Sequence, residues 1–218
     1  HGGGPRIKRE LDKSNIQSKF IRGLRVTDEK MINIVESVLI DFNNDIVDSL
    51  KKFGTDAVSI HTKKNNIIKV TPEAKELGYI RIPNKIDNNL IKNILNKKQV
   101  PIISPLGLGN DNHPYNINGD TAAGAIAKSL KSRRLLLMTN VEGVLDKNKK
   151  LIDEIFSLEI LKMIEDNTIT EGMIPKINTC LDAVNNGVTA VGIIDGRKQH
   201  SILFEIFSDK GSGTLIRK

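Results

Sequence analysis

The carboxyl-terminal half of the chain alternates short apolar runs with stretches of helical period. Apolar runs of strand length occupy residues 100–104, 135–138, 189–194 and 214–216. Helical patterns separate or follow them at residues 120–130, 158–165, 175–185 and 201–207. This alternation is typical of a parallel sheet, because consecutive parallel strands need a crossover connection that is usually a helix. The sequence therefore predicts an α/β fold in which residues 214–216 form an edge strand.

A long helical stretch follows a short extended piece in the amino-terminal half. Thr27 is expected to cap this helix, whose apolar face repeats at helical spacing from Met31 to Phe42. A second helix is expected at residues 46–53, because Gly54 is well placed to end it in a left-handed conformation.

Turn residues then mark two short strands. The polar run at residues 63–66 separates apolar segments at 57–60 and 67–70, which predicts a hairpin. Asp87 is expected to cap a further helix at residues 88–96.

Composition limits the class of partner. With 39% hydrophobic and only 4% aromatic residues, the core must be built from aliphatic side chains. No stretch reaches the roughly 20 apolar residues of a membrane span. The formal charge of +7 lies largely on Lys-rich loops without the aromatic residues that stack on bases, so we expect neither a membrane nor nucleic acid as partner. The single cysteine, Cys180, favours a reducing compartment, the cytoplasm or, for an organellar protein, the plastid stroma.

Two segments near the start of the chain can bind anions. The glycines of His1-Gly2-Gly3-Gly4-Pro5 precede a predicted helix at residues 6–13, where bare backbone N–H groups and the positive helix end can hold an anion. A turn without a ligand is the alternative interpretation. Arg25 precedes the next helix, where it can hold a carboxylate in a bidentate fork or simply be solvated.

Further polar groups lie at the ends of predicted elements later in the chain. Asn116 and Asp120 lie in a loop between a strand and a helix, where open α/β sheets bind ligands, although Asp120 is also a suitable helix cap. The polar turn Thr139-Asn140-Val141-Glu142-Gly143-Val144 follows an apolar strand. Lys176 stands near a helix start, where a cation is favourable only if an anion lies nearby.

Together, these segments resemble a known family. The sequences HGGGP, GLRVTD, YNINGDTAAG, TNVEGVLD, GMIPK and IIDGR, in this order, resemble the N-acetylglutamate kinases of the amino-acid kinase family, and the resemblance covers residues 1–218. It implies a three-layer αβα sandwich with a mainly parallel central sheet. It also implies an incomplete amino-terminal lobe, residues 1–114, for the acyl amino acid and for dimerisation, and an ATP-binding lobe at residues 115–218.

The resemblance implies a kinase that uses ATP to phosphorylate the γ-carboxylate of N-acetyl-L-glutamate, the second step of arginine biosynthesis. Gly2 and Gly3 would donate backbone hydrogen bonds to the transferring phosphoryl group, and Asp120 would orient the lysines of the site. The substrate would be held by Gly3, Arg25 and Asn116. ATP would be bound by Thr139, Asn140, Gly143, Val144 and Lys176, with Mg²⁺ carried by the nucleotide and no metal site of the protein's own.

Two departures from the family pattern bear on the activity and the substrate. The family has a further lysine on a first strand ahead of HGGGP, so we expect residues 1–218 alone to be catalytically impaired. The family hairpin over the substrate usually reads Gly-Lys-Asp-Gly, whereas residues 61–66 read HTKKNN. Two alternatives stay open: a kinase of the same fold for another acyl amino acid, such as an aminoadipate derivative, or a non-catalytic regulatory homologue.

The tail of the chain resembles the arginine-inhibited branch of the family. This resemblance implies an L-arginine site that includes Glu205 and Gly211. The alternative is a glutamate that merely faces solvent on an amphipathic helix. The family further implies a homodimer or a hexamer of three dimers, and a PII-type signalling protein as a partner.

Overall fold

The structure, a computed structural model of the chain, describes all residues except 22, 73–76, 170–172 and 209–210. The chain divides into two compact units, His1–Ala122 and Ala123–Lys218, and the division falls inside helix α4. The assignment of one ligand to each predicted lobe stays a prediction.

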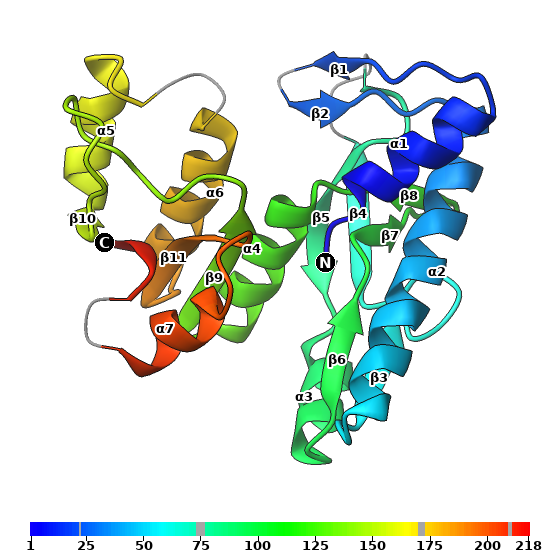
Figure 1. Ribbon diagram of the computed structural model, residues 1–218. Coiled ribbons are helices and arrows are strands. Elements are labelled where there is room, and N and C mark those ends of the chain that lie inside the picture. The colour runs from blue at the N-terminus through cyan, green and yellow to red at the C-terminus, as the bar shows by residue number, and fades with distance from the viewer. Residues whose placement is uncertain (22, 73–76, 170–172, 209–210) are drawn as a thin grey trace. The chain divides into compact units, whose positions relative to one another are not determined.

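The first unit combines helices with small sheets (Figure 1). Its helices are α1 (Gly4–Lys13), α2 (Glu29–Lys52), α3 (Asn88–Asn96) and the start of α4 (Gly119–Leu130). Its strands are β1 (Phe20–Ile21), β2 (Leu24–Arg25), β3 (Ala57–Ile60), β4 (Ile68–Pro72), β5 (Arg81–Ile86), β6 (Val100–Ile103), β7 (Leu106–Leu108) and β8 (Pro114–Asn116). β3 and β6 pair in parallel, so their carboxyl ends meet at one edge. β5, β4, β7 and β8 form a four-stranded sheet in that order, and β1 pairs with β2.

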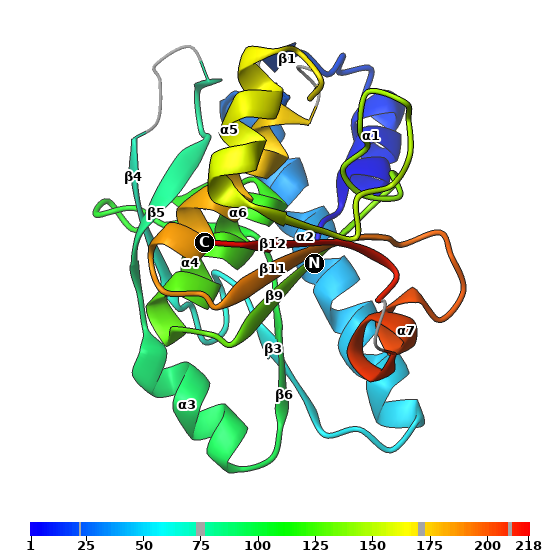
Figure 2. The ribbon, with the colours of Figure 1, turned by 90° about the vertical axis from the view of Figure 1, so that its left-hand side faces the viewer.

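The second unit is built on a four-stranded sheet in the order β10, β12, β11, β9. Its strands are β9 (Arg134–Thr139), β10 (Glu154–Phe156), β11 (Ala190–Asp195) and β12 (Gly213–Arg217), and its further helices are α5 (Ser157–Glu165), α6 (Ile174–Asn185) and α7 (Ser201–Phe207). β11 runs parallel to β9 and β10 runs parallel to β12, and Figure 2 shows β9, β11 and β12 side by side. The predicted α/β fold with parallel strand pairing is confirmed.

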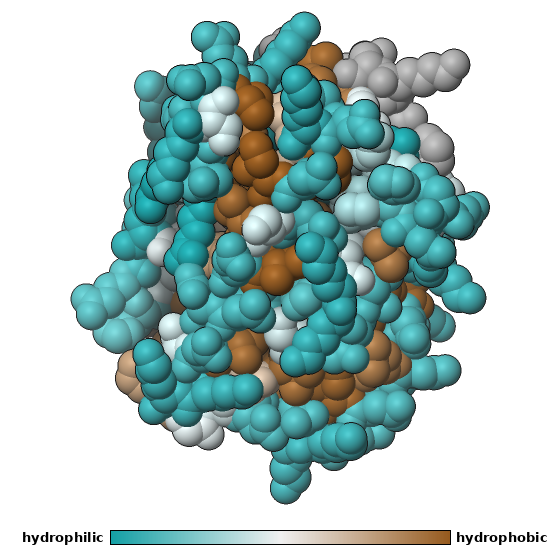
Figure 3. All heavy atoms as spheres, turned by 90° about the vertical axis from the view of Figure 1, so that its right-hand side faces the viewer, coloured by the Kyte–Doolittle hydropathy of each residue, from teal (hydrophilic) through white to brown (hydrophobic). Residues whose placement is uncertain are grey.

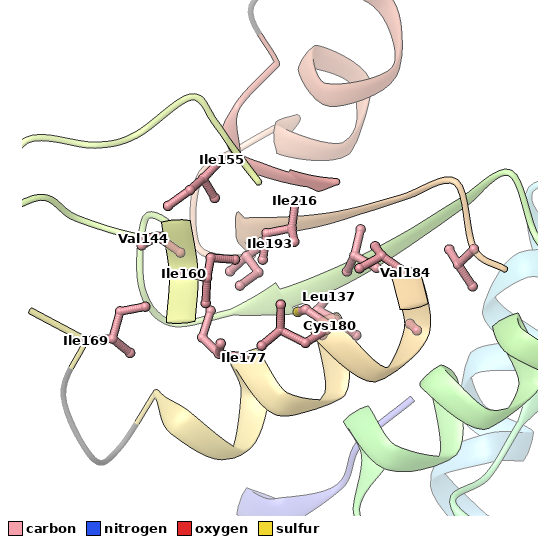
Figure 4. Close-up of a cluster of buried hydrophobic side chains, with 14 of the residues drawn as sticks. Leu137, Val144, Ile155, Ile160, Ile169, Ile177, Cys180, Val184, Ile193 and Ile216 are labelled. Carbon is pink, nitrogen blue, oxygen red and sulfur yellow. The ribbon is translucent and has the colours of Figure 1, made fainter. Parts of the chain in front are cut away.

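Aliphatic side chains fill the core of the second unit (Figure 4). Ile193 of β11 packs in one cluster with Ile177 and Cys180 of α6, and all three are fully buried. The neighbouring Gly192 faces α7, since a Cβ placed on it would lie 3.3 Å from Glu205 Oε1. Because successive strand residues point to opposite faces, α6 and α7 cover opposite sides of the sheet.

In the first unit, α1 packs on α2. Ile7 and Leu11 of α1 join Met31, Val35 and Leu39 of α2 in a buried cluster, as the helical spacing of the apolar residues predicts. Figure 3, which views this unit from the side of α2, shows mainly hydrophilic atoms with apolar atoms exposed in a broken band between them.

The two helices predicted between residues 27 and 53 are one. α2 continues without a break through 24 residues, so the prediction of a separate second helix is wrong. Asp28 caps it, because its Oδ1 accepts a hydrogen bond from the backbone N–H of Met31 at 2.8 Å, and the predicted cap at Thr27 is therefore also wrong. Gly54 follows the helix with a φ of 80°, as expected for a left-handed terminator.

The predicted hairpin between residues 57–60 and 67–70 is wrong. β3 pairs with β6, whereas β4 pairs with β5 and β7. Only an isolated bridge between His61 and Lys64 closes the turn. The local polar run does form a turn, but the strands after it find partners elsewhere in the sequence.

Two further predictions need correction. β12 is not an edge strand, because β10, which the sequence did not reveal, lies on its outer side. Asp120 does not cap α4. The side chain of Asn118 accepts from the N–H groups of Asp120 and Thr121, at 3.0 and 3.1 Å.

Candidate active site

The glycine turn opens helix α1 in the first unit. Gly3 is the N-terminal cap residue of α1, and a Cβ on it would lie 2.6 Å from Leu39 Cδ2 of α2, closer than real Cβ atoms approach. A Cβ on Gly2 or Gly4 would meet nothing within 4 Å. The turn is therefore pressed against α2 at Gly3 while its neighbours leave open space, which is the form that a backbone cradle for an anion requires.

The start of α4 lies beside this turn. A Cβ on Gly119 would lie 3.7 Å from the Cα of Gly2. Asp120 follows in the first turn of α4, where the helix dipole favours a carboxylate. The structure thus brings together two segments that the sequence singled out at opposite ends of the first unit.

Asn116 is the last residue of β8, three residues before Gly119 at the start of α4. Its Nδ2 is 3.4 Å from the hydroxyl oxygen of Thr27, and that hydroxyl donates to the carbonyl of Arg25 at 2.9 Å. Since three residues span at most about 11 Å, Asn116 lies within that distance of Gly119 and hence close to the glycine turn. Gly78 makes this arrangement feasible, because a Cβ there would overlap the carbonyl oxygen of Thr27.

Arg25 is half-buried beside this group. Its guanidinium donates to the hydroxyl of Ser18 and lies 4.7 Å from the ring centroid of Phe20. Burial lowers the pKa of Arg25, and the charge of Asp12 partly opposes the shift. Within the described part of the chain, Arg25 forms no ion pair with a carboxylate within 4.0 Å. A half-buried guanidinium that has no ion pair within the described residues is suited to an incoming carboxylate.

The turn after β3 is tied to α2 by a buried carboxylate. Glu36 accepts a hydrogen bond from the hydroxyl of Thr62 at 2.5 Å and lies 3.5 Å from Lys63 Nζ. His61 is itself buried, and its Nδ1 accepts from the backbone N–H of Lys63 at 3.3 Å. Burial is the main cause that lowers the pKa of His61. This turn stands at the carboxyl end of β3, the edge at which parallel strands present ligand sites.

A cavity of about 660 Å³ lies in the second unit. Gly143 and Val144 line it, as do the charged residues Lys147 and Asp166, which pair at 2.8 Å. The hydrogen bond from Lys147 is the largest cause that lowers the pKa of Asp166 to about 2. At 300–1,000 Å³, cavities of this kind hold small-molecule ligands.

Gly143 has no space for a side chain. Its φ is 153°, and a Cβ would overlap the hydroxyl of Thr214 and lie 2.7 Å from Leu151 Cδ1. The backbone N–H of Val144 donates to that same hydroxyl at 2.8 Å. The polar turn after β9 is thus held against β12.

Thr139 ends β9 at the carboxyl edge of the sheet, and Asn140 follows it. Thr139 pairs with Asp195 of the parallel strand β11, and its carbonyl accepts from the N–H of Gly196 at 2.8 Å. The side chain of Arg197 donates two hydrogen bonds of 2.9 Å to the carboxylate of the buried Asp195. These hydrogen bonds are the largest cause that lowers the pKa of Asp195 to about 2. This ion pair lies directly beside Thr139 in the sheet.

Lys176 lies in the first turn of α6. The cap residue of this helix, Met173, makes no side-chain capping bond, and the first turn holds no acidic residue. Met173 also lines the cavity, so the helix start that carries Lys176 opens on the same space as Gly143 and Val144. Gly172, the first residue of the GMIPK segment, lies outside the described residues.

Glu205 is buried rather than solvated. Its Oε2 accepts from the N–H of Ser212 at 3.0 Å, and Arg134 Nη1 lies 3.7 Å from its Oε1 and donates to its carbonyl at 3.2 Å. A Cβ on Gly211 would lie 2.6 Å from Glu205 Oε2. The predicted pair of Glu205 and Gly211 therefore lies together.

Sequence reasoning missed the residues that support these segments. Glu36 and Asn43 interrupt the buried face of α2 with polar groups, and Asn118 was assigned no role of its own. A buried polar residue at an otherwise apolar helical position is the signal that could have revealed Glu36 and Asn43, because such groups must be hydrogen-bonded.

Among the described residues, no group of three or more His, Cys, Asp and Glu could hold a metal ion. No helix of that same part of the chain is long and apolar enough to span a membrane.

Comparison with known proteins decides the family. The model of the amino acid kinase family matches residues 1–195. The chain belongs to the amino acid kinase family. One relative of this family, named acetylglutamate kinase, from Pelagibacter ubique, is 55% identical over 218 residues, which are 100% of this chain and 76% of the relative. Another acetylglutamate kinase, from Methylobacterium nodulans, is 43% identical, covering 100% of this chain and 76% of the relative.

A solved structure agrees with this assignment. The crystal structure of smu.665 from Streptococcus mutans UA159 matches with a TM-score of 0.86 and 30% identity, covering 100% of this chain and 84% of that one. The predicted amino-acid kinase fold is therefore confirmed.

Proposed function

We propose that this chain phosphorylates the γ-carboxylate of N-acetyl-L-glutamate with ATP, the second step of arginine biosynthesis. The observation that carries the proposal is the adjacency of the glycine turn to the start of α4, with Gly119 against Gly2. The identity of 55% to an acetylglutamate kinase over the entire chain supports the choice of substrate.

The reaction requires alignment and charge neutralisation rather than a base. A γ-carboxylate has a pKa of roughly 4.3 and is therefore ionised at neutral pH, so it can attack the phosphorus without losing a proton. Catalysis then depends on holding two anions in line and on offsetting the charge of the transferring group. The backbone N–H groups of Gly2 and Gly3 would donate hydrogen bonds to the transferring phosphoryl group. Lys176 would offset the negative charge of the phosphates, and Asp120 would orient the lysines of the site. Mg²⁺ enters with the nucleotide, held mainly by phosphate oxygens and water.

The amino acid would be held by Arg25 and Asn116. The half-buried guanidinium of Arg25 would take the α-carboxylate, and the amide of Asn116 would bind the polar main-chain end. The backbone of Gly3 would line the site of the same ligand, with its N–H directed at the phosphoryl group. The lowered pKa of Arg25 and its lack of a carboxylate partner in the described part of the chain support this role.

ATP would occupy the cavity of the second unit. Its volume of about 660 Å³ suits a nucleotide, and Gly143 and Val144 line it. Thr139, Asn140 and Lys176 would complete the site. Lys149, which also lines the cavity, would provide further positive charge toward a polyphosphate, whereas Lys147 is paired with Asp166.

The test is ADP release by the full-length protein with MgATP and several acceptors. We expect turnover with N-acetyl-L-glutamate, and a kcat/KM at least about tenfold lower with N-acetyl-2-aminoadipate, since one extra methylene typically costs 10 to 200-fold. A preference for the aminoadipate compound would favour the alternative kinase. If no acceptor gave turnover, the result would favour the alternative that the protein is a non-catalytic regulatory homologue.

The proposal includes feedback by L-arginine at Glu205. The guanidinium of a bound arginine would replace that of Arg134 at the buried carboxylate, and Gly211 lies directly against that carboxylate, since a Cβ on it would be 2.6 Å from Glu205 Oε2. Calorimetry of the full-length protein with L-arginine should give binding heat that is lost in Glu205→Gln. Glu154→Gln, which alters an exposed carboxylate paired with Arg217 in the same unit, is the matched control. Equal binding by Glu205→Gln, or no heat at millimolar arginine, would remove the regulatory site.

Assembly and location complete the proposal. A homodimer or a hexamer of three dimers, a PII-type signalling partner, and a cytoplasmic or plastid-stromal location rest on the family resemblance. The broken apolar band on the side of α2 supports association between copies (Figure 3).

A further inference from the structure

Asn43 is a fully buried amide on α2 with all of its polar atoms engaged. Its Oδ1 accepts a hydrogen bond from the hydroxyl of Ser59 at 2.6 Å. Its Nδ2 donates to the carbonyl of Ile102 at 2.9 Å and lies 3.0 Å from His1 Nε2. The carbonyl of Ile102 can only accept, so it fixes which end of the amide faces His1.

This arrangement assigns the tautomer of His1. The amide nitrogen of Asn43 carries hydrogens and has no acceptor capacity, so His1 Nε2 must accept and cannot carry a proton. The ring proton therefore resides on Nδ1, which lies 2.9 Å from the carbonyl oxygen of Gly2. The ring is further fixed by edge packing against Phe42, with centroids 5.2 Å apart. Neutral His1 thus links the buried Asn43 to the glycine turn.

The carbonyl of Gly2 and the N–H of Gly3 belong to one peptide unit. In a planar trans peptide these two groups point in opposite directions, so a partner that fixes the carbonyl also aims the N–H. Glycine on both sides leaves this unit free to rotate, because glycine has few steric limits on its dihedral angles. A Cβ on Gly3 would lie 2.6 Å from Leu39 Cδ2, so Leu39 favours glycine at this position. Glycine by itself does not select the direction of the peptide.

We propose that His1 is a positioning residue: it pins the carbonyl of Gly2 so that the N–H of Gly3 points at the phosphoryl group in transit. This inference rests on the proposed kinase function. His1 touches neither substrate nor nucleotide in this role. It acts through the peptide unit, and Asn43 acts through His1.

Kinetics of paired variants separate this role from mere packing. Asn places its amide nitrogen near the position of the histidine Nδ1, whereas Gln places its amide near Nε2. His1→Gln should therefore keep a partner for Asn43 but lose the donor to Gly2, and lower kcat about tenfold or more with the KM of both substrates within about twofold. His1→Asn should restore kcat to within about threefold of the unsubstituted protein. His113→Gln, at an exposed position of the same unit, is the control and should leave both parameters unchanged.

A spectroscopic readout tests His1 without any turnover. Nitrogen-15 NMR of histidine-labelled full-length protein should show the Nδ1–H tautomer for the resonance that disappears in His1→Gln. An Nε2–H tautomer, or equal kcat losses in His1→Asn and His1→Gln, would overturn the inference. If the unsubstituted protein released no ADP with N-acetyl-L-glutamate, the proposed function would fail while the tautomer measurement still decided the link from Asn43 to Gly2.

Discussion

Replacing Lys176 with alanine is expected to lower kcat by about a hundredfold or more in the full-length protein. The side chain lies in the first turn of α6, whose cap residue makes no side-chain capping bond and whose first turn holds no acidic residue. A cation there opposes the helix dipole, so its location is unfavourable without an anion nearby. Removing one preorganised group that stabilises transition-state charge typically costs ~3 kcal/mol of barrier, which corresponds to this loss. Steady-state ADP release with both substrates varied is the measurement.

Arg25→Ala is the matched comparison, because it removes a cation from the proposed amino-acid site instead. It should chiefly raise the KM for N-acetyl-L-glutamate, since a group that holds the ground state and the transition state equally leaves kcat unchanged. An unchanged kcat in Lys176→Ala, with only the KM for ATP altered, would contradict the charge-neutralising role. A large fall of kcat in Arg25→Ala would mean that the α-carboxylate is not its partner.

Elements with a complete local signal could be predicted from the sequence. The helix at residues 201–207 and the Asp87 cap of α3 are where the pattern placed them, because helical period and capping involve residues within one or two turns. The cap of α2 was misplaced by one residue, since Thr27 and Asp28 are both good caps. The side chain of Thr27 is used elsewhere, in a bond to the carbonyl of Arg25.

Strand partners could not be predicted in the same way. β3 and β4 flank a good turn, yet β3 pairs with β6 and β4 with β5. β5 contains Pro83 and Lys85 and therefore lacks the apolar alternation of a strand. Pairing between distant segments depends on how the whole sheet buries its apolar face, which no short window of sequence contains.

The candidate site likewise has a part that could be predicted from local sequence and a part that could not. The glycine turn and the Asn116 loop could be identified as anion and ligand segments from their residue types, but their contact at Gly2 and Gly119 is a property of the fold. The supporting residue Asn43 was not identified from the sequence, because α2 was predicted from the spacing of its apolar residues alone. Its three polar contacts appear only when α2, β3, β6 and the glycine turn are together.

Replacing Gly213 with alanine is expected to destabilise the second unit strongly. Gly213 begins β12 opposite Ile194, and a Cβ there would overlap the carbonyl oxygen of Ile193 and lie 2.9 Å from its carbonyl carbon. Both atoms belong to the backbone of β11, so no side chain can rotate away, and the two strands would have to separate. Overpacking typically costs about 1–3 kcal/mol, and a clash with backbone on both strands is expected at the upper end, about 3 kcal/mol. A loss of that size should lower the melting temperature by about 10 °C, measured by circular dichroism.

Gly196→Ala controls for the change of residue type in the same unit. Its Cβ would lie 3.4 Å or more from every neighbour, and its φ is not positive, so the substitution meets neither overlap nor backbone strain. The melting temperature of this variant should stay within about 2 °C of the unsubstituted protein, as for most surface substitutions. If Gly213→Ala melted no lower than Gly196→Ala, β12 could shift away from β11 at little cost. The close approach of the two strands would then not be what requires glycine at this position.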